Sequence, residues 1–312
     1  MKLSIIVPCY NEEKNVFLIH DAINKIFKKT KIKYEIIFVN DGSSDGTQKN
    51  LNKIVETTKC DVKVIHFSRN FGKEAALFAG LKNSSGDYVS LIDADMQQDP
   101  KYVLDMVEFL DKNEDYDSVA LYQEKRKENK LVGFLKGCFY KIINKVSDTK
   151  FVSNASDFRT LRRTMVDAIL SMQEYYRFSK GIFSWVGFNT YYMPYEVHER
   201  ASGSTKWSIR KLFKYAFDGI ISFTTAPLRF ATYTGLLSTL ASFIYIIVII
   251  VQKLAFDSSP PGYASTVVLL LFFGGIQLFS LGIIGEYLGR VYIETKKRPI
   301  YIAKEIRKSG KK

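Results

Sequence analysis

Two carboxylates one residue apart, Asp93 and Asp95, follow directly after the apolar run DYVSLI, and Gln97 comes two positions later. Because the chain leaves its extended path at the end of a strand, both acids can reach a divalent cation and the hydroxyls of a ribose. Magnesium keeps several positions for water and phosphate oxygens, so one or two protein carboxylates suffice to hold it. The alternative is a loop of solvated acids, since this spacing is common. The residues around the motif must decide between the two.

The charge balance indicates an anionic partner. The 312 residues carry 45 Lys and Arg against 32 Asp and Glu, a net charge of +13, which leaves nucleic acid, acidic lipid headgroups and phosphorylated substrates as candidates. The three cysteines include no CxxC pair and the three histidines show no ligand spacing, so neither a disulfide framework nor a zinc site is indicated. No GxGxxG follows the first apolar run, which argues against a nicotinamide dehydrogenase.

The first 125 residues alternate short β-branched runs with helical stretches. LSIIVPCY, YEIIFVND, VKVIHFS and DYVSLIDAD are typical of strands buried on both faces of a parallel sheet. Helices are predicted to begin near Asn11, Ser44 and Gly72, with Asn11 as a helix cap. Such an α/β sheet binds ligands at the carboxyl ends of its strands. The polar residues at these ends fall within 8–12, 40–44, 68–73 and 93–97.

Residues 126–200 are interpreted as the acceptor half of the same domain, with a basic helix over 131–146 and strands over 157–161 and 191–197. The segment 208–225 places apolar residues at helical spacing and Arg210, Lys211 and Lys214 on the other face. This composition favours an interfacial helix on anionic lipid. An ordinary surface helix packed on the domain is the alternative.

Two later segments, 226–252 and 263–285, meet the length of about 20 largely apolar residues that a helix needs to cross a bilayer. A buried core helix is the alternative, but the length and weak amphipathicity favour membrane spans. Basic residues precede the first segment and follow the second, so both chain ends and the body of the protein are expected in the cytoplasm. The N-terminal apolar run is too short for a signal peptide. The basic excess near the spans is explained by lipid, and no nucleic-acid partner is expected.

The order of five motifs identifies a family resemblance. PCYNEE, VNDGSSDGT, SRNFGKEAALFAGL, GDYVSLIDADMQQDP and HERASGSTKW, followed by two spans, resemble the family-two inverting glycosyltransferases over essentially the whole chain. Within that family the chain is similar to the polyprenyl-phosphate branch, which includes bactoprenol glucosyltransferases and dolichyl-phosphate mannosyltransferases. The resemblance implies a GT-A type nucleotide-sugar-binding domain with a mostly parallel sheet over 1–207, the interfacial helix, the two transmembrane helices and a basic cytoplasmic tail over 286–312.

The resemblance also implies roles for individual residues. Asp93, Asp95 and Gln97 match metal ligands, while Asp157, in SDFR, matches an acid that positions the acceptor or acts as a base. A structural ion pair with Arg159 or Arg162 is the alternative for Asp157. The implied nucleotide-sugar site comprises Pro8, Tyr10, Asn11, Glu12, Asp41, Lys73 and Asp93, and the implied phosphate contacts are Arg126, Arg200, Ser204 and Lys206.

This chain departs from its relatives at two places. It reads DADMQQDP where many relatives read DADLQDPP, and it has Gln123 where an Arg of relatives aligns. Arg200 and Lys206 belong to RASGSTK, a loop that in the family brings cations onto the donor diphosphate or acceptor phosphate. Catalysis is therefore expected to depend on Asp95, Arg200, Lys206 and Asp157.

The expected reaction is a single displacement with inversion from a UDP-sugar to undecaprenyl or another polyprenyl phosphate, aided by Mg²⁺ or Mn²⁺. The acceptor phosphate, with a second pKa of about 6, is already largely ionised at neutral pH and needs no strong base. Glucose or N-acetylglucosamine is the favoured sugar. Further expectations are a homo-oligomer, for which five glycines of the second span allow close packing, a separate flippase and an extracytoplasmic transferase.

Three other functions stay open from the sequence. A polysaccharide synthase of the same superfamily would usually carry a Gln-x-x-Arg-Trp motif and more spans, and neither Trp185 nor Trp207 follows an Arg. A GDP-mannose-using mannosyltransferase would share all five motifs. A membrane-bound sensor or scaffold would keep the nucleotide-sugar pocket but lose the metal and cation residues, whereas Asp95, Arg200 and Lys206 are all present.

Overall fold

The computed structural model describes residues 1–123, 155–195, 219–256 and 262–310, together with several positions between 133 and 152. Its centre is an eight-stranded sheet of order β7-β5-β6-β4-β1-β2-β3-β8. Strands β1 to β4 run parallel, whereas β6 is antiparallel to β4 and β5, and β8 is antiparallel to β3. The strands are β1 (Lys2–Cys9), β2 (Lys33–Asn40), β3 (Asp61–Phe67), β4 (Tyr88–Leu91), β5 (Ser118–Tyr122), β6 (Ala155–Arg162), β7 (Thr190–Pro194) and β8 (Ala303–Lys308).

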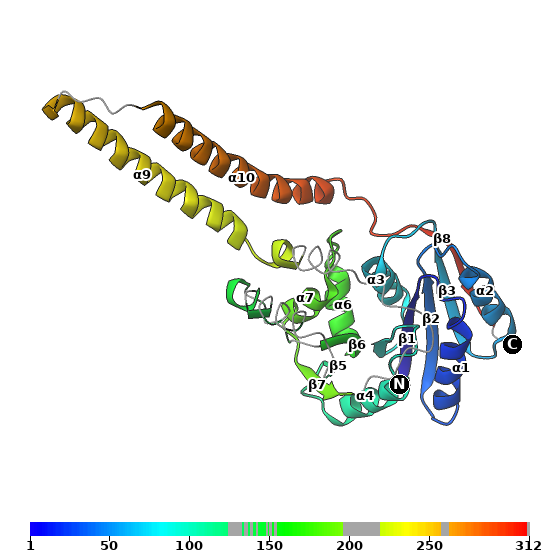
Figure 1. Ribbon diagram of the computed structural model, residues 1–312. Coiled ribbons are helices and arrows are strands. Elements are labelled where there is room, and N and C mark those ends of the chain that lie inside the picture. Colours follow the sequence, from blue (N-terminus) through cyan, green and yellow to red (C-terminus); the bar gives the residue numbers. More distant parts are fainter. Residues whose placement is uncertain are drawn as a thin grey trace. The chain divides into compact units, whose positions relative to one another are not determined.

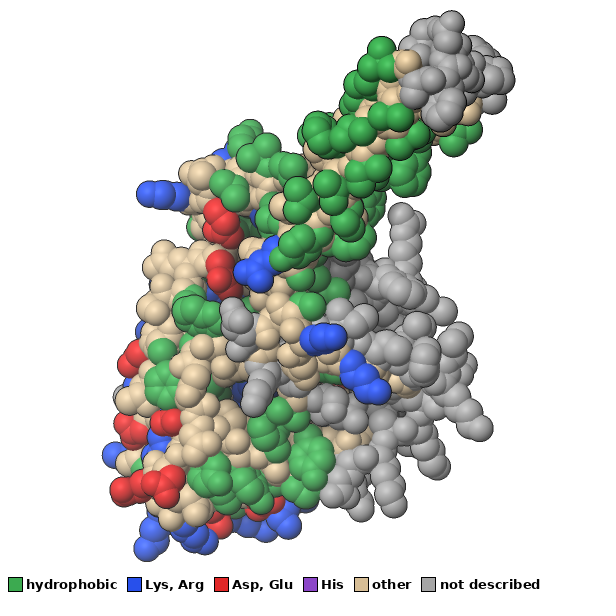
Figure 2. Space-filling view, turned by 90° about the vertical axis from the view of Figure 1, so that its left-hand side faces the viewer, with side chains coloured by type: hydrophobic (Ala, Val, Ile, Leu, Met, Phe, Trp, Pro, Cys, Tyr) green, Lys and Arg blue, Asp and Glu red, His purple; other side chains and the backbone are tan. Residues whose placement is uncertain are grey.

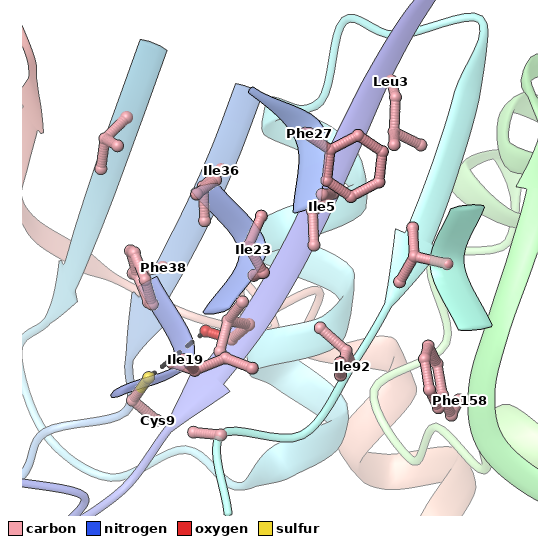
Figure 3. Close-up of a cluster of buried hydrophobic side chains, with 14 of the residues drawn as sticks. Leu3, Ile5, Cys9, Ile19, Ile23, Phe27, Ile36, Phe38, Ile92 and Phe158 are labelled. Carbon is pink, nitrogen blue, oxygen red and sulfur yellow. Dashed lines mark hydrogen bonds between the residues drawn. The ribbon is translucent and has the colours of Figure 1, made fainter. Parts of the chain in front are cut away.

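Helices cover both faces of this sheet (Figure 1). On one face, Ile19, Ile23 and Phe27 of α1 pack with Ile5 and Ile36 of the central strands in a fully buried core (Figure 3). Burial on both faces explains why the strands read as continuous apolar runs. The helices of this domain are α1 (Val16–Phe27), α2 (Thr47–Thr57), α3 (Lys73–Asn83), α4 (Lys101–Lys112), α6 (Arg163–Ser171) and α7 (Ser179–Trp185).

The opposite face of the sheet holds α3 close to β1. Gly80 makes this approach possible, because a Cβ at Gly80 would lie 2.3 Å from Cγ2 of Ile6. Along β1, Leu3, Ile5 and Val7 belong to the core beneath α1, while Ile6 points to α3. The alternation of a pleated strand therefore fills two cores at once, and the predicted mostly parallel α/β sheet is confirmed.

A second compact unit contains the helical hairpin of α9 (Ala226–Phe256) and α10 (Tyr263–Thr295). Both helices are long and apolar enough to cross a membrane, over Ala226–Gln252 and Ser265–Thr295, and neither span is buried. Figure 2 shows hydrophobic side chains gathered on the surface of these helices. Within the hairpin, Tyr287 donates its hydroxyl hydrogen to the carbonyl of Thr224 over 2.7 Å. The predicted position of the first span agrees closely, whereas the second helix continues ten residues beyond the predicted end.

The glycines of α10 do not mediate its packing on α9. Apart from the adjoining residues and backbone of α10 itself, no atom of the described residues lies within 4 Å of the position where a Cβ would stand at any of them, namely Gly274, Gly275, Gly282, Gly285 and Gly289. Their expected role in oligomer packing stays a prediction.

The expected basic tail over 286–312 is wrong in its structure. Residues up to Thr295 extend α10, and Ala303–Lys308 form β8, which pairs with β3. Ser309 continues this attachment, because its Oγ accepts from the amide of Val62 and donates to the carbonyl of Cys60. The basic residues of this segment favoured a tail, but lysines are also typical of an edge strand, where they discourage further pairing.

The predicted cap at Asn11 is wrong as well. The first helix begins at Val16 after Asn15, and Asn11 adopts a left-handed conformation with φ of 55°. Its side-chain oxygen instead accepts from the amide of Ser44 at 2.9 Å, and its own amide donates to Ser43 Oγ at 3.0 Å. Asn tolerates positive φ better than most residues, so it joins two loops and caps no helix.

Candidate functional site

The register of β4 and β6 brings Asp93 and Asp157 together. Leu91 of β4 pairs with Arg159 of β6 in an antiparallel ladder, so the residue two beyond Leu91 lies across from the residue two before Arg159. Lys73, at the start of α3, occupies the space between the two acids. Its Nζ lies 2.7 Å from Oδ1 of Asp93 and 3.2 Å from Oδ2 of Asp157. We call these three residues the Lys73 cluster.

Electrostatics within the Lys73 cluster favour the charged forms of Asp157 and Lys73. Burial alone would raise the pKa of Asp157, but the positive charges of Lys73, Lys180 and Arg159 lower that pKa well below its ordinary value. The two carboxylates in turn raise the pKa of Lys73, whose side chain is 43% exposed. Among the described residues the ion-pair partner of Asp157 is Lys73, and neither Arg159 nor Arg162 forms a salt bridge with it. The role of Asp157 toward the acceptor stays a prediction.

Asp95 lies in a tight turn that follows β4. Met96 has a positive φ of 60°, and the amide of Gln97 donates to Oδ1 of Asp95 at 3.1 Å. Asp99 lies just before α4, and its Oδ1 accepts from the amide of Lys101, the first residue of that helix, at 2.8 Å. Asp93 thus contacts Lys73, whereas Asp99 bonds to the start of α4.

The described residues fit a divalent cation that is shared with a polyphosphate. No group of three or more His, Cys, Asp or Glu side chains in the described part of the chain could hold a metal by itself. Two partly exposed carboxylates, those of Asp93 and Asp95, are nevertheless enough for Mg²⁺ when substrate phosphates supply further oxygens. To bind the metal, the Asp93 carboxylate would have to give up its ion pair with Lys73. Asp95 and Gln97, in the turn after β4, would supply the other protein ligands.

The loops after β1 and β2 form the wall expected to bind the nucleotide. Pro8 lies in β1, and Tyr10 follows that strand with 42% of its surface exposed, as an aromatic platform for a base requires. Glu12 donates its amide hydrogen to Thr47 Oγ1 at 2.9 Å, and its carboxylate accepts from Asn15. These bonds hold the two loops in a defined shape.

Asp41 has a structural role that the sequence does not reveal. Its carboxylate is buried and accepts from the amides of Phe71 at 2.6 Å and Gly72 at 3.0 Å. Burial raises the pKa of Asp41, and these two hydrogen bonds oppose the rise. Asp41 thus fixes the loop that leads into Lys73, and its contact with a base stays a prediction.

Glu74 is a half-buried acid that sequence reasoning missed. It follows Lys73 in α3, and its Oε2 accepts from the amide of Ser179 at 3.0 Å and from the hydroxyl of the same residue. Burial and the charge of Asp157 raise the pKa of Glu74 to about 7. Because Ser179 begins α7, Glu74 ties that helix to the Lys73 cluster. The sequence signal that could have indicated Glu74 is its position directly after Lys73, a predicted site residue.

Two histidines lie in structural networks as expected. His66 accepts or donates hydrogen bonds with Asn40 at 3.0 Å and with Asn52 at 2.9 Å, and His20 contacts Asp21 and Thr58. Outside the described residues lie the predicted phosphate ligands Arg126, Arg200, Ser204 and Lys206, half of the predicted helix over 131–146, and 208–218 of the predicted interfacial helix.

A mostly parallel sheet with acids at the carboxyl end of β4 is the arrangement of a GT-A type glycosyltransferase. The model of glycosyl transferase family 2 matches residues 4–170, and that of the GtrB C-terminal hairpin matches residues 226–291. The chain belongs to glycosyl transferase family 2. The protein is therefore a glycosyltransferase, as the motifs predicted.

Several relatives align along almost the whole chain. The protein CsbB of Bacillus subtilis (strain 168) is 46% identical over 304 residues, 97% of this chain and 91% of that protein. The prophage bactoprenol glucosyl transferase homolog of Escherichia coli (strain K12) is 40% identical over 99% of this chain and 100% of its own length. The bactoprenol glucosyl transferase of Shigella phage SfII is 40% identical over 98% of both chains.

Among solved structures, glucosyl-3-phosphoglycerate synthase from Mycobacterium tuberculosis, in complex with Mn²⁺, UDP-glucose and phosphoglyceric acid, is 18% identical. It matches with a TM-score of 0.46 over 69% of this chain and 76% of its own.

Proposed function

We propose that this glycosyltransferase moves a hexose from a UDP-sugar to polyprenyl phosphate, giving a polyprenyl-monophosphate sugar for the cell envelope. Glucose is favoured by the names of the phage and prophage relatives, which align over 98% or more of this chain, and N-acetylglucosamine is the second choice. The observation that carries the proposal is the Lys73 cluster beside Asp95, a charged site able to receive a metal and a diphosphate.

The departing nucleoside diphosphate is the main electrostatic problem of this reaction, because a second polyanion must approach it. Mg²⁺ or Mn²⁺, held by Asp93, Asp95 and Gln97, would neutralise the diphosphate as it leaves. Lys73 lies within reach of the same oxygens once Asp93 turns to the metal. Arg200 and Lys206, with Ser204 and Arg126, are proposed to bring further positive charge and hydrogen-bond donors onto the phosphates.

We propose a single displacement with inversion at the anomeric carbon. The acceptor phosphate is itself the nucleophile, and with a second pKa of about 6 it is mostly ionised at neutral pH. Asp157, whose pKa Lys73 lowers, is a weak proton acceptor. This supports a positioning role for Asp157 over that of a general base.

The hairpin of α9 and α10 supports a location in the cytoplasmic membrane, with the catalytic domain and both chain ends in the cytoplasm. Two spans are few for moving a lipid-linked sugar across the bilayer. A separate flippase and an extracytoplasmic transferase are therefore proposed as later steps, and a homo-oligomer as the working form.

The test is transfer of radiolabelled sugar from a panel of UDP- and GDP-sugars to undecaprenyl phosphate by the purified full-length chain. We expect product from one UDP-sugar, none after chelation of divalent metal, recovery with added Mg²⁺ or Mn²⁺, and loss in Asp95→Asn. Asp21→Asn is the matched control, because this acid has a side chain 77% exposed on α1. Absence of product with every donor, although nucleotide binds, would overturn the proposal in favour of a sensor.

A further inference from the structure

A pocket beside the Lys73 cluster combines two cations with apolar walls. It lies between β6, α7 and β7, and its lining includes Arg159, Lys180, Phe178, Phe183, Val152 and Tyr192. Val152 lines the pocket and is 40% exposed, so part of the apolar lining lies at the protein surface. We call this space the Arg159 pocket.

Arg159 is buried in the pocket, and its hydrogen-bond donors are only partly satisfied by the described residues. Its side chain is 4% exposed, its guanidinium stacks 3.9 Å from the ring centroid of Phe183, and Nη2 donates to the carbonyl of Ser156 at 3.0 Å. Its Nε is buried and has no hydrogen-bond partner among the residues that the structure describes. Leaving a buried donor unsatisfied costs about 1–3 kcal/mol, and more for a charged group. Burial lowers the pKa of Arg159 accordingly.

Lys180 adds a second positive charge to the same pocket. Neither Lys180 nor Arg159 forms a salt bridge with a carboxylate among the described residues, since the nearby Asp157 bonds to Lys73. Both cations act on Asp157 only at longer range, by lowering its pKa. Within the described part of the chain, the pocket therefore offers two cations without a carboxylate in contact, next to aromatic rings that suit a hydrocarbon chain.

We propose that the Arg159 pocket binds a phosphate monoester with an apolar chain, the phosphate on Arg159 and Lys180 and the first hydrocarbon units against Phe178, Phe183 and Val152. This rests on the proposed function and assigns the acceptor its own subsite. Asp157 and Arg159 are two positions apart on β6 and so point to the same face. A phosphate on Arg159 consequently lies beside the acid that Lys73 links to Asp93, where the donor is expected.

The test measures equilibrium binding of radiolabelled farnesyl phosphate to the detergent-solubilised full-length chain, without any sugar donor. Lys180→Gln should weaken binding about tenfold, the effect of losing one charge-assisted contact of about 1.4 kcal/mol. The control is Lys112→Gln, which removes the same charge from a side chain 77% exposed on α4 and should leave binding unchanged. Farnesol and inorganic phosphate, tested separately as competitors, should each compete at least about tenfold less well than farnesyl phosphate.

Arg159→Lys is the second variant, because it keeps the charge but loses the planar donor array. It should also weaken farnesyl phosphate binding, while UDP binding stays as in the wild type. Equal affinity for farnesyl phosphate in the wild type and in Lys180→Gln would overturn the proposal, as would farnesol competing as well as farnesyl phosphate.

The same variants separate this proposal from the proposed function. Sugar transfer to polyprenyl phosphate with an unchanged acceptor KM in Lys180→Gln would overturn the subsite and leave the function standing. Farnesyl phosphate binding that depends on Lys180, in a chain that transfers sugar from no donor, would support the subsite and reject the function.

Discussion

Lys73 and Asp157 are 84 positions apart in sequence, yet Nζ of Lys73 lies 3.2 Å from Oδ2 of Asp157. The same ammonium also holds Asp93, so one cation neutralises an acid from β6 and an acid that follows β4. A divalent cation on Asp93 would compete with Lys73 for that carboxylate and release the ammonium toward the donor phosphates. The arrangement links metal binding to the charge of the whole site.

Lys73→Gln is expected to lower kcat/KM for sugar transfer about tenfold to thousandfold, the range for removing one donor that stabilises developing negative charge. Lys82→Gln, at an exposed position of the same helix, is the control and should leave kcat/KM unchanged. Steady-state transfer assays measure both. Full activity in Lys73→Gln would show that Lys73 only neutralises Asp93 and Asp157 and does not act on the donor.

Asp157→Asn should lower transfer about tenfold without changing the shape of the pH profile. Lys73 lowers the pKa of Asp157 so far that the acid stays ionised throughout the assay range. The acidic limb of kcat/KM should instead follow the acceptor phosphate, with a midpoint of about 6. Profiles of both proteins between pH 5 and 9 check this. Disappearance of the acidic limb in the variant would assign proton transfer to Asp157.

Glu74→Gln should change how stability depends on pH. The pKa of Glu74 is about 7 in the fold and ordinarily 4.5, so the folded state binds this proton more tightly than the unfolded state does. The contribution to stability is therefore full below pH 4.5 and is lost as pH rises through about 7.

Gln keeps an acceptor oxygen for Ser179 and has no charge to bury, so the variant should gain stability over the wild type at pH 8. The limit is about 3 kcal/mol, from 1.4 kcal/mol per pKa unit. Thermal unfolding of both proteins at pH 5 and pH 8 measures the difference. Glu108→Gln, whose side chain is 56% exposed on α4, is the control. A Tm difference between Glu74→Gln and wild type that is the same at both pH values would contradict the raised pKa.

Tyr301→Ala should destabilise the sheet domain by about 2 kcal/mol through lost burial and ring stacking. The ring of Tyr301 stacks on Phe67 at 5.0 Å and meets Phe78 edge-on at 6.5 Å, next to β8. Tyr301→Phe should have little effect, because the contact of its hydroxyl with Asn83 is long, at 3.5 Å. Urea unfolding in detergent compares the two. Equal stability of Tyr301→Ala and wild type would mean that β8 contributes little to the domain.

Local patterns predicted the elements near the N-terminus because each signal lies within one segment. The apolar runs of β1 to β4 are long enough to mark strands buried on both faces, and the acids Asp93 and Asp95 come directly after one of them. Hydropathy and length likewise located α9 and α10, since crossing a bilayer depends on a continuous stretch of sequence. The start of the first helix was predicted less accurately. Asn is a favourable N-cap residue, but Asn11 forms hydrogen bonds with the loop residues Ser43 and Ser44 and does not cap α1.

The partners of these elements were decided only by tertiary structure. Ala303–Lys308 has the composition of a charged tail, yet it pairs with β3 as a strand. Asp41 was predicted to bind a base, and only the structure shows that it also accepts hydrogen bonds from the amides of Phe71 and Gly72. By itself, the sequence determined which residues could do chemistry and at which end of the sheet they would lie. The antiparallel register of β4 and β6 decided that Asp93 and Asp157 share Lys73, because strand register depends on contacts between segments remote in the chain.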